Sequence, residues 1–220
     1  MTVEFGDAID PTTNARAVAF AEEIRKRAWR GVVDIVPTYR SVTLHVDPLH
    51  LNLVALMKRV RCLAAFPVDV RGEGGRRHSI PVVYGGEWGP DLLDVAAWAK
   101  LSVEETVRVH ASVEYRVFML GFAPGFPYLG SVPDRLAMTR LPTPRRVVPA
   151  GSVGIAEHQT GIYPVAIPGG WRIIGRTPMP LFRPTADRPF LLSPGDSVRF
   201  TPIEPEEFYH LVRECDADRA

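Results

Sequence analysis

Residues 121–130 read Gly-Phe-Ala-Pro-Gly-Phe-Pro-Tyr-Leu-Gly, and this stretch decides the fold of the 220-residue chain. It follows residues 113–120, whose apolar side chains alternate as they do in a β-strand. Two prolines without backbone donors and three glycines that tolerate positive φ predict that the strand ends in an irregular loop. The loop carries Phe122, Phe126 and Tyr128. Such large rings either close the end of a barrel or form the wall of a binding groove.

Proline and glycine divide the chain into two regions. Fourteen of the 21 prolines and ten of the 18 glycines lie between residues 121 and 202. Long helices do not form at that density of proline, so short strands and turns are expected there, closing into a small barrel. The strands are predicted at residues 146–156, 161–167, 171–177 and 197–201, with an amphipathic helix at 204–215.

The N-terminal region shows the alternation of strands and helices that is typical of a split βαβ arrangement. Asp10 followed by Pro11 predicts a helix N-terminus, and the same pair recurs at Asp47 and Pro48. Strands are expected at residues 3–6, 32–36 and 40–46, with a last one at either 68–70 or 79–84. The predicted fold class is therefore α+β. A ferredoxin-like domain is expected over residues 1–84, followed by a β-barrel domain over residues 85–220.

The join between these domains is expected at residues 85–90, where glycine, tryptophan and proline are concentrated. Pro90 then starts a helix, and Ser102 and Glu105 have the spacing of a capping box for the next one. Residues 71–78 combine glycines with arginines. They lack the spacing and the lysine of a P-loop, so an exposed turn is favoured over a phosphate site.

The charge balance narrows the classes of partner. A formal net charge of +1 argues against a nucleic acid or a membrane surface as the main partner. The first ten residues contain acids and no apolar segment, and no apolar run is long enough to span a bilayer. Cys62 and Cys215 are isolated in sequence, which fits a reduced protein. We therefore expect a cytoplasmic protein.

Arginines are the candidate anion-binding groups. From residue 139 to residue 185 there are six arginines against one acid, Glu157. Guanidinium groups bind oxyanions in a bidentate manner, so converging arginines would form a site for carboxylate or phosphate. Arginine outnumbers lysine 23 to 3 in the whole chain, however, so solvated strand ends are an equal alternative. The six are Arg140, Arg145, Arg146, Arg172, Arg176 and Arg183.

Other candidate site residues lie around the aromatic loop. His110 on an apolar helix face is more often a packed core histidine than a catalytic one, but the aromatic loop follows closely. Polar groups near a later turn either bind a ligand or satisfy the local backbone. No histidine pair has metal-ligand spacing, and neither a Gly-x-Ser-x-Gly elbow nor a dinucleotide fingerprint is present. No metal site is expected. The candidate ligand contacts are Phe122, Phe126, Tyr128, Ser152, Gln159, Thr160 and Tyr163.

Four motifs in order resemble the Kip inhibitor / allophanate hydrolase subunit 1 family. The resemblance covers nearly the whole chain and implies a ferredoxin-like N-terminal domain followed by a cyclophilin-like C-terminal β-barrel. Family members usually have a longer first strand, whereas this chain opens directly at residues 2–6, so a short first strand or an upstream start is expected. The motifs are Gly121-Phe-Ala-Pro-Gly-Phe-Pro-Tyr-Leu-Gly130, Pro149-Ala-Gly-Ser-Val-Gly-Ile155, Gln159-Thr-Gly-Ile-Tyr-Pro164 and Pro168-Gly-Gly-Trp-Arg-Ile-Ile-Gly-Arg-Thr-Pro178.

The same resemblance implies a function. Such proteins act as the B subunit of an ATP-dependent 5-oxoprolinase, which opens 5-oxo-L-proline to L-glutamate. Their expected partners are the A subunit and a larger C subunit, which is similar to allophanate hydrolase subunit 2. ATP is used by the complex, and this chain is expected to be inactive alone.

In that interpretation His110, Arg145 and Arg176 are the catalytic candidates, with the arginines neutralising a carboxylate or a phosphorylated intermediate. The resemblance also leaves two alternative functions open. One is a module that inhibits a sensor histidine kinase, and the other is the carboxyltransferase half of a urea carboxylase.

Overall fold

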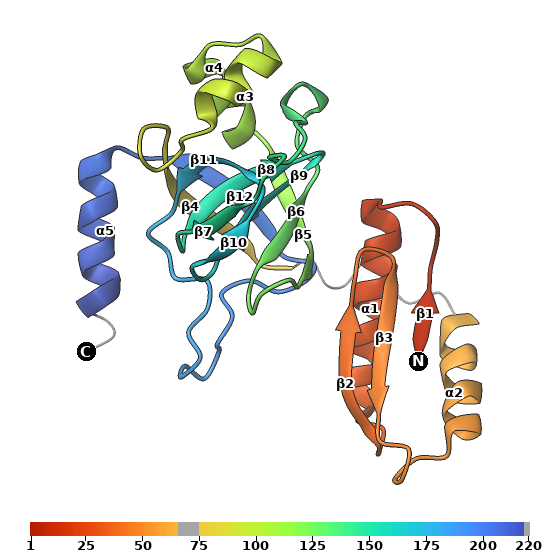
Figure 1. The fold of residues 1–220 in the computed structure, drawn as a ribbon. Helices are drawn as coiled ribbons and strands as arrows, with labels where there is room; N and C mark the ends of the chain where they lie inside the picture. The colour runs from red at the N-terminus through yellow and green to blue at the C-terminus, as the bar shows by residue number, and fades with distance from the viewer. Residues whose placement is uncertain (66–74, 218–220) are drawn as a thin grey trace. The chain divides into compact units, whose positions relative to one another are not determined.

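The structure, a computed structural model, describes residues 1–65 and 75–217. The chain forms two compact units, Met1–Gly75 and Arg76–Ala220 (Figure 1). No helix in the described ranges is both long and apolar enough to cross a membrane.

The first unit packs two helices and a three-stranded antiparallel sheet around an apolar core that includes Phe20, Leu44 and Leu56. The Asp10 carboxylate accepts hydrogen bonds from two backbone N–H groups, so the first helix begins as predicted. The second helix begins later than predicted, because Asp47 caps a turn instead. The elements are β1 (Thr2–Glu4), α1 (Pro11–Arg27), β2 (Val32–Pro37), β3 (Ser41–Val46) and α2 (Leu53–Ala65), and the strand order is β1-β3-β2.

The predicted domain boundary after residue 84 is wrong. The strand expected at residues 79–84 is β4 (Arg77–Tyr84), and it belongs to the second unit, where it pairs in parallel with β12 (Ser197–Pro202) and antiparallel with β11 (Arg172–Arg176). These partners are remote in sequence, so a local pattern cannot reveal the pairing. The other expected end of the first domain, residues 68–70, lies outside the described residues. The ferredoxin-like fold therefore stays a prediction.

The second unit is a closed seven-stranded barrel, which confirms the predicted β-barrel domain and fits a cyclophilin-like one. The strands close in the order β11-β4-β12-β5-β6-β9-β8, and a short β10-β7 sheet lies beside them. The remaining elements are α3 (Leu92–Ala99), α4 (Val103–Ala111), β5 (Glu114–Leu120), β6 (Pro127–Gly130), a 3₁₀-helix (Asp134–Leu136), β7 (Arg145–Val148), β8 (Ser152–Ala156), β9 (Gln159–Ile162), β10 (Ile167–Gly169) and α5 (Pro205–Ala217).

Two of the predicted strands are interrupted. Residues 146–156 form β7 and β8, separated by a turn in which Gly151 has a φ of +81°. Residues 161–167 are divided between the end of β9 and the start of β10. The capping box at Ser102 and Glu105 is confirmed. Its position fixes the start of α4, the helix that carries His110.

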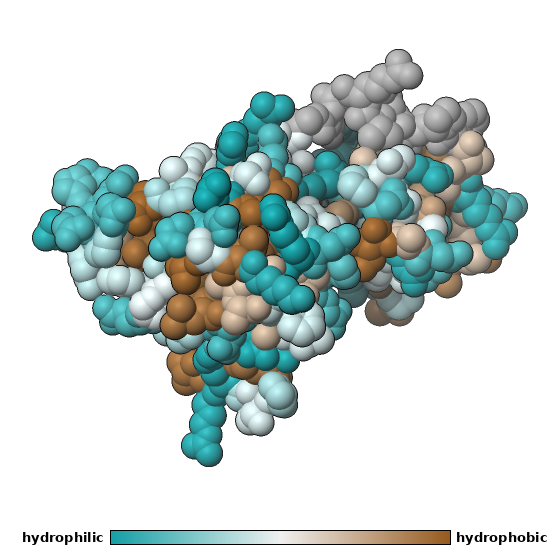
Figure 2. All heavy atoms as spheres, turned by 90° about the horizontal axis from the view of Figure 1, so that it is seen from above, coloured by the Kyte–Doolittle hydropathy of each residue, from teal (hydrophilic) through white to brown (hydrophobic). Residues whose placement is uncertain are grey.

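The barrel interior is apolar, as period-2 alternation requires. Val117, Leu129, Ile155 and Phe200 are buried together inside it, contributed by four different strands. The outer surface carries both polar and apolar side chains, and the apolar ones reach the surface between polar ones (Figure 2). Because the barrel is closed, its strands have no free edges. A ligand or a partner must therefore be recognised by side chains and loops.

Candidate functional site

The aromatic loop, residues 121–126, connects β5 to β6 and is held by its own backbone. The Gly121 N–H donates to the Phe126 carbonyl at 3.1 Å, and the Phe126 N–H donates to the Ala123 carbonyl at 3.0 Å. Gly125 adopts a φ of +81°, and Phe122 adopts a φ of +65°. A positive φ is unusual for a residue with a bulky side chain and costs on the order of 1 kcal/mol or more.

Phe126 is the centre of an aromatic cluster, defined here as Phe122, Phe126, Tyr128, Tyr163 and Trp171. It makes edge-to-face contacts with the other four rings, at centroid distances of 5.0 to 5.7 Å. The Phe126 side chain is 1% exposed, whereas Phe122 is 68% exposed. Phe126 is therefore a buried anchor, but it belongs to a cluster separate from the barrel core and does not close the end of the barrel. Trp171 was not predicted as a site residue, although it lies inside the fourth motif.

Glycines allow the cluster to lie directly against the outer face of the β8–β9 hairpin. A Cβ added at Gly161 would lie 3.0 Å from both Phe126 Cζ and Trp171 Cζ3, and one added at Gly154 would lie 3.1 Å from Trp171 Cβ. Gly154 and Gly161 are opposite each other in the β8–β9 ladder. Any larger residue at these positions would lift the rings off the sheet.

The exposed end of the aromatic loop lines a hollow of about 360 Å³, bounded by residues 120–125 and Phe190. Phe190 stacks on Phe182 with a centroid distance of 5.2 Å. A Cβ added at Gly125 would lie 3.2 Å from Phe182 Cβ, so the segment that carries Phe182 and Phe190 is in close contact with the aromatic loop. Exposed Phe122 and half-exposed Phe190 therefore form one apolar surface.

Arg145 is held by a buried carboxylate. Its Nη2 donates to Asp91 Oδ1 at 2.7 Å and its Nη1 to the Trp171 carbonyl at 3.4 Å. Asp91 is only 5% exposed, and its second oxygen accepts from the Ile173 backbone N–H at 2.6 Å. This arrangement joins the start of α3 to β7 and β11. Sequence reasoning missed Asp91, because its partner lies 54 residues away.

The structure does not bring Arg145 and Arg176 together. Arg145 contacts Trp171, the residue before β11, whereas Arg176 ends that strand, about 17 Å further along at the usual rise per residue. The Arg176 Nε donates to the Ala150 carbonyl at 2.8 Å, and the side chain lines a separate hollow of about 220 Å³ beside α5. Their catalytic roles stay predictions, but a single two-arginine clamp is not formed.

Arg140 lies near two tyrosines of the aromatic cluster, Tyr128 and Tyr163. Burial raises the pKa of Tyr128 and of Tyr163, and the positive charge of Arg140 partly opposes this rise in both. Arg140 is exposed, and its guanidinium makes no ion pair with a described residue. A cation beside two phenol groups and an apolar surface has the chemistry to receive a small carboxylate.

His110, on α4, is fully buried against the barrel strands. Tyr84 Oη is 2.9 Å from Nδ1, and Thr160 Oγ1 is 3.1 Å from Nε2. Thr160 donates its hydroxyl proton to the Gly154 carbonyl at 2.9 Å, so it accepts from His110, and Tyr84 donates to the other nitrogen. Burial lowers the His110 pKa to about 3. The ring is neutral and stacks on Phe200, with centroids 4.7 Å apart.

This geometry makes His110 a structural tie rather than an exposed base. Both ring nitrogens are engaged, and none of the buried side-chain nitrogen or oxygen atoms in the described ranges lacks a partner. Thr160 belongs to this internal network, not to the aromatic cluster. Tyr84 was not predicted as a site residue, because its strand was assigned to the other domain.

The last two predicted contacts occupy positions in the strand ladder. Ser152 is buried at the start of β8, and its carbonyl accepts from the Tyr163 N–H at 2.9 Å. Gln159 is partly exposed at the start of β9 and is opposite Gly130 and Ala156. Among the residues the structure describes, no group of three His, Cys, Asp or Glu side chains could hold a metal ion.

The sequence is similar to those of known proteins. The chain matches the family described as carboxyltransferase domain, subdomain C and D, over residues 1–192. It is 42% identical over 226 residues to the 5-oxoprolinase B subunit of Bacillus subtilis (strain 168), across 97% of this chain and 93% of that relative. It is 47% identical over 188 residues to the protein of the same name from Escherichia coli O157:H7, across 81% and 85% respectively.

A solved structure has a similar fold. The crystal structure of TTHA0988 superposes with a TM-score of 0.83 at 40% identity, across 93% of this chain. The chain spans only 40% of the length of that protein. These findings confirm the resemblance drawn from the four motifs, and the chain belongs to the carboxyltransferase domain, subdomain C and D, family.

Proposed function

We propose that this chain is the B subunit of a 5-oxoprolinase, the complex that opens 5-oxo-L-proline to L-glutamate with hydrolysis of ATP. The observation that carries the proposal is the similarity to two proteins named as B subunits of 5-oxoprolinase, at 42% and 47% identity over most of both chains. Because both are oxoprolinase subunits by name, neither kinase inhibition nor urea carboxylation is favoured.

The chain is inactive alone in this proposal. Cleavage of a lactam with ATP needs a group to activate the amide and a site for the nucleotide. His110 is buried and neutral, and Arg145 is held by Asp91, so neither is available to a substrate in the conformation described. The A and C subunits would supply the missing groups, and the catalytic assignments to His110, Arg145 and Arg176 would then depend on a rearrangement in the complex.

The aromatic cluster is the proposed contact region. Phe126 anchors the loop, while Phe122 is both exposed and at positive φ, which is doubly unfavourable in an isolated chain. A partner that covers Phe122 and Phe190 would offset that cost. We assign Phe122 to contact with the C subunit, and Tyr128, Tyr163 and Arg140 to the carboxylate of 5-oxoproline. Ser152, Gln159 and Thr160 do not contact the substrate in this proposal and instead stabilise strands β8 and β9.

Two finer assignments complete the proposal. The first unit is ferredoxin-like, because its five described elements follow the expected β-α-β-β-α order with strand order β1-β3-β2. The protein works in the cytoplasm, where its two free cysteines, Cys62 and Cys215, stay reduced.

A reconstitution assay tests the proposal. The chain, its candidate partner subunits and their mixture are each given 5-oxo-L-proline and ATP, and L-glutamate is quantified. Cleavage only by the mixture that contains this chain is expected. Cleavage by the chain alone would refute its inactivity, and an assembled complex that never cleaves 5-oxoproline would refute the function.

A further inference from the structure

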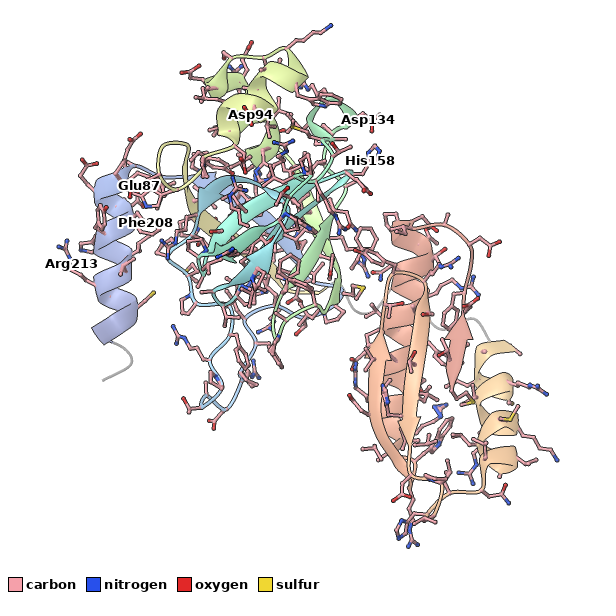
Figure 3. The ribbon with its side chains drawn as sticks, viewed as in Figure 1. Glu87, Asp94, Asp134, His158, Phe208 and Arg213 are labelled. Atoms are coloured by element: carbon pink, nitrogen blue, oxygen red, sulfur yellow. The ribbon has the colours of Figure 1, made fainter. Side chains whose placement is uncertain are left out.

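A second cavity, of about 770 Å³, lies on the outside of the barrel. It is bounded by α4, the turn after β4, the end of β12 and the start of α5, and none of its described lining residues belongs to the aromatic cluster. Figure 3 shows its neighbourhood, with Phe208 on α5 next to the turn that carries Glu87. The function proposed above leaves this cavity unused.

The cavity is larger than 5-oxoproline requires. Sites for drug-sized ligands span roughly 300–1,000 Å³, and a five-membered lactam with one carboxylate would fill only a small part of 770 Å³. A ligand of nucleotide size fits. The cavity is therefore large enough for the second substrate that an ATP-dependent oxoprolinase requires.

The inner wall offers flat apolar surfaces that are fixed in place. Tyr84 is held by its hydrogen bond to His110, and Trp88 packs against Phe208 and Tyr209 at centroid distances of 5.9 and 6.2 Å. Aromatic side chains of this kind stack on nucleobases without regard to hydrogen-bond pattern. His110 therefore positions Tyr84 in the wall of the cavity.

The rim carries charges of both signs. Arg108 comes from α4 and Arg199 from β12, and neither guanidinium forms an ion pair or donates a hydrogen bond to a described residue. Arg108 lies near Glu105, whose pKa it helps to lower. Glu104 and Glu204 also line the cavity. Carboxylates oppose a bare phosphate chain, but Mg²⁺ is commonly held between one or two carboxylates and the phosphates of its nucleotide.

We infer that this cavity binds a magnesium–adenine nucleotide. The base lies against Tyr84 and Trp88, the phosphates lie at Arg108 and Arg199, and the metal ion lies at Glu104 or Glu204. The inference rests on the proposed function, which requires ATP in the complex. It also accounts for a sequence that has no P-loop, because the phosphates are held by side chains from separate elements.

Calorimetric titration of MgATP tests the inference without any turnover. It is done on the full chain and on the complex with its partner subunits. Arg108→Ala with Arg199→Ala should weaken MgATP binding at least about tenfold while adenosine binding changes little, since only the phosphate contacts are lost. Ala111→Trp, which fills the cavity, should abolish both. Glu104→Gln with Glu204→Gln should remove the dependence on Mg²⁺.

Matched controls separate charge from folding. Arg61→Ala with Arg213→Ala removes two exposed helical arginines that do not line the cavity and should leave binding unchanged. Thermal unfolding checks that every variant is folded. Absence of MgATP binding in both the chain and the complex would overturn the inference, as would unchanged binding by the Arg108/Arg199 variant.

The two proposals fail in different ways. A complex that cleaves 5-oxoproline normally with the Arg108/Arg199 variant would overturn the nucleotide site and leave the function standing. A complex that binds MgATP through these arginines but never cleaves 5-oxoproline would do the reverse.

Discussion

The two faces of the β8–β9 hairpin use neighbouring residues in opposite ways. On the inner face, Thr160 bonds to His110 in a network with both ring nitrogens engaged. On the outer face, Gly161 has no side chain, and the aromatic cluster lies against it. The inner network is closed, whereas the outer cluster ends in an exposed phenylalanine. Function is therefore expected at the exposed end of the outer cluster, whereas the inner network and the buried part of the cluster contribute to stability.

The contrast matters for how the site residues are interpreted. A histidine and a threonine beside a conspicuous loop suggest catalysis. Strand alternation, however, turns Thr160 to the inner face, where it bonds to His110 of α4, and both side chains are fully buried. The aromatic residues suggest packing, yet one of them is left at the surface with an unfavourable backbone. Substitutions on each side of the hairpin test this division, from the largest expected effect to the smallest.

Phe126→Ala should cost the most stability. The ring is buried and touches four other aromatics, and removing a buried Phe costs about 3–5 kcal/mol. Urea unfolding of the isolated chain measures the loss. Because the barrel unit contains this cluster, its unfolding transition should move while that of the first unit does not. A loss below about 1 kcal/mol would show that the cluster is loosely packed.

His110→Leu should destabilise the barrel by about 2–4 kcal/mol, since the Tyr84 hydroxyl loses its partner, the Thr160 hydroxyl loses one of its two, and the ring packing changes. His110→Gln, which retains a donor and an acceptor, is the matched control and should lose less. Urea unfolding compares the two variants with the wild type. Equal losses would mean that ring packing, rather than hydrogen bonding, dominates at this position.

The pH dependence of stability should reveal the buried histidine. In the unfolded chain His110 binds a proton near its ordinary pKa of 6.5, whereas in the folded chain the pKa is about 3. The contribution of neutral His110 to the free energy of unfolding is therefore complete above pH 6.5 and is lost as the pH falls toward 3. Between pH 7 and pH 5 the wild type should lose about 2 kcal/mol more than His110→Leu. Parallel curves for the two proteins would contradict the depressed pKa.

Arg145→Ala should destabilise by about 1–3 kcal/mol, because it leaves the buried Asp91 carboxylate without its ion pair. Arg176→Ala, which removes one hydrogen bond to a carbonyl, should cost about 1 kcal/mol or less. Thermal unfolding of both variants ranks them. If Arg145→Ala leaves stability unchanged but abolishes activity in the complex, Arg145 acts on the substrate and its ion pair with Asp91 is not its main role.

Phe122→Ala should have the smallest effect on stability, within about 0.5 kcal/mol, because the ring is exposed. Its effect should appear in assembly, where an exposed aromatic anchor commonly contributes 2 kcal/mol or more, by order of magnitude. Light scattering of mixtures with the larger partner measures this. Leu93→Ala removes another exposed apolar side chain outside the cluster and should not change assembly.

Local signals in the sequence predicted local structure well. The Asp10 cap, the Ser102–Glu105 capping box and the irregular aromatic loop are each fixed by a few adjacent residues, and each is observed. Strand alternation and proline density predicted a barrel in the second half of the chain. The four motifs predicted the family.

Non-local pairings were not predictable in the same way. β4 belongs to the barrel because it pairs with β12, and no short pattern in residues 77–84 indicates that partner. Arg145 was proposed as an anion-binding residue because only one acid lies between residues 139 and 185, and its actual partner, Asp91, is 54 residues away. The sequence also could not separate Phe126 from Phe122, since both rings lie in the same loop and only the backbone conformation sends one inward.

Titration of the partner subunits with this chain tests the central claim most directly. The initial rate of ATP-dependent L-glutamate formation from 5-oxo-L-proline is measured as wild-type chain or Phe122→Ala is added. With the wild type, the rate should rise from zero to a plateau. With Phe122→Ala, the same plateau should need at least about tenfold more protein, because binding and not chemistry is weakened. A rate that is independent of added chain would contradict the account.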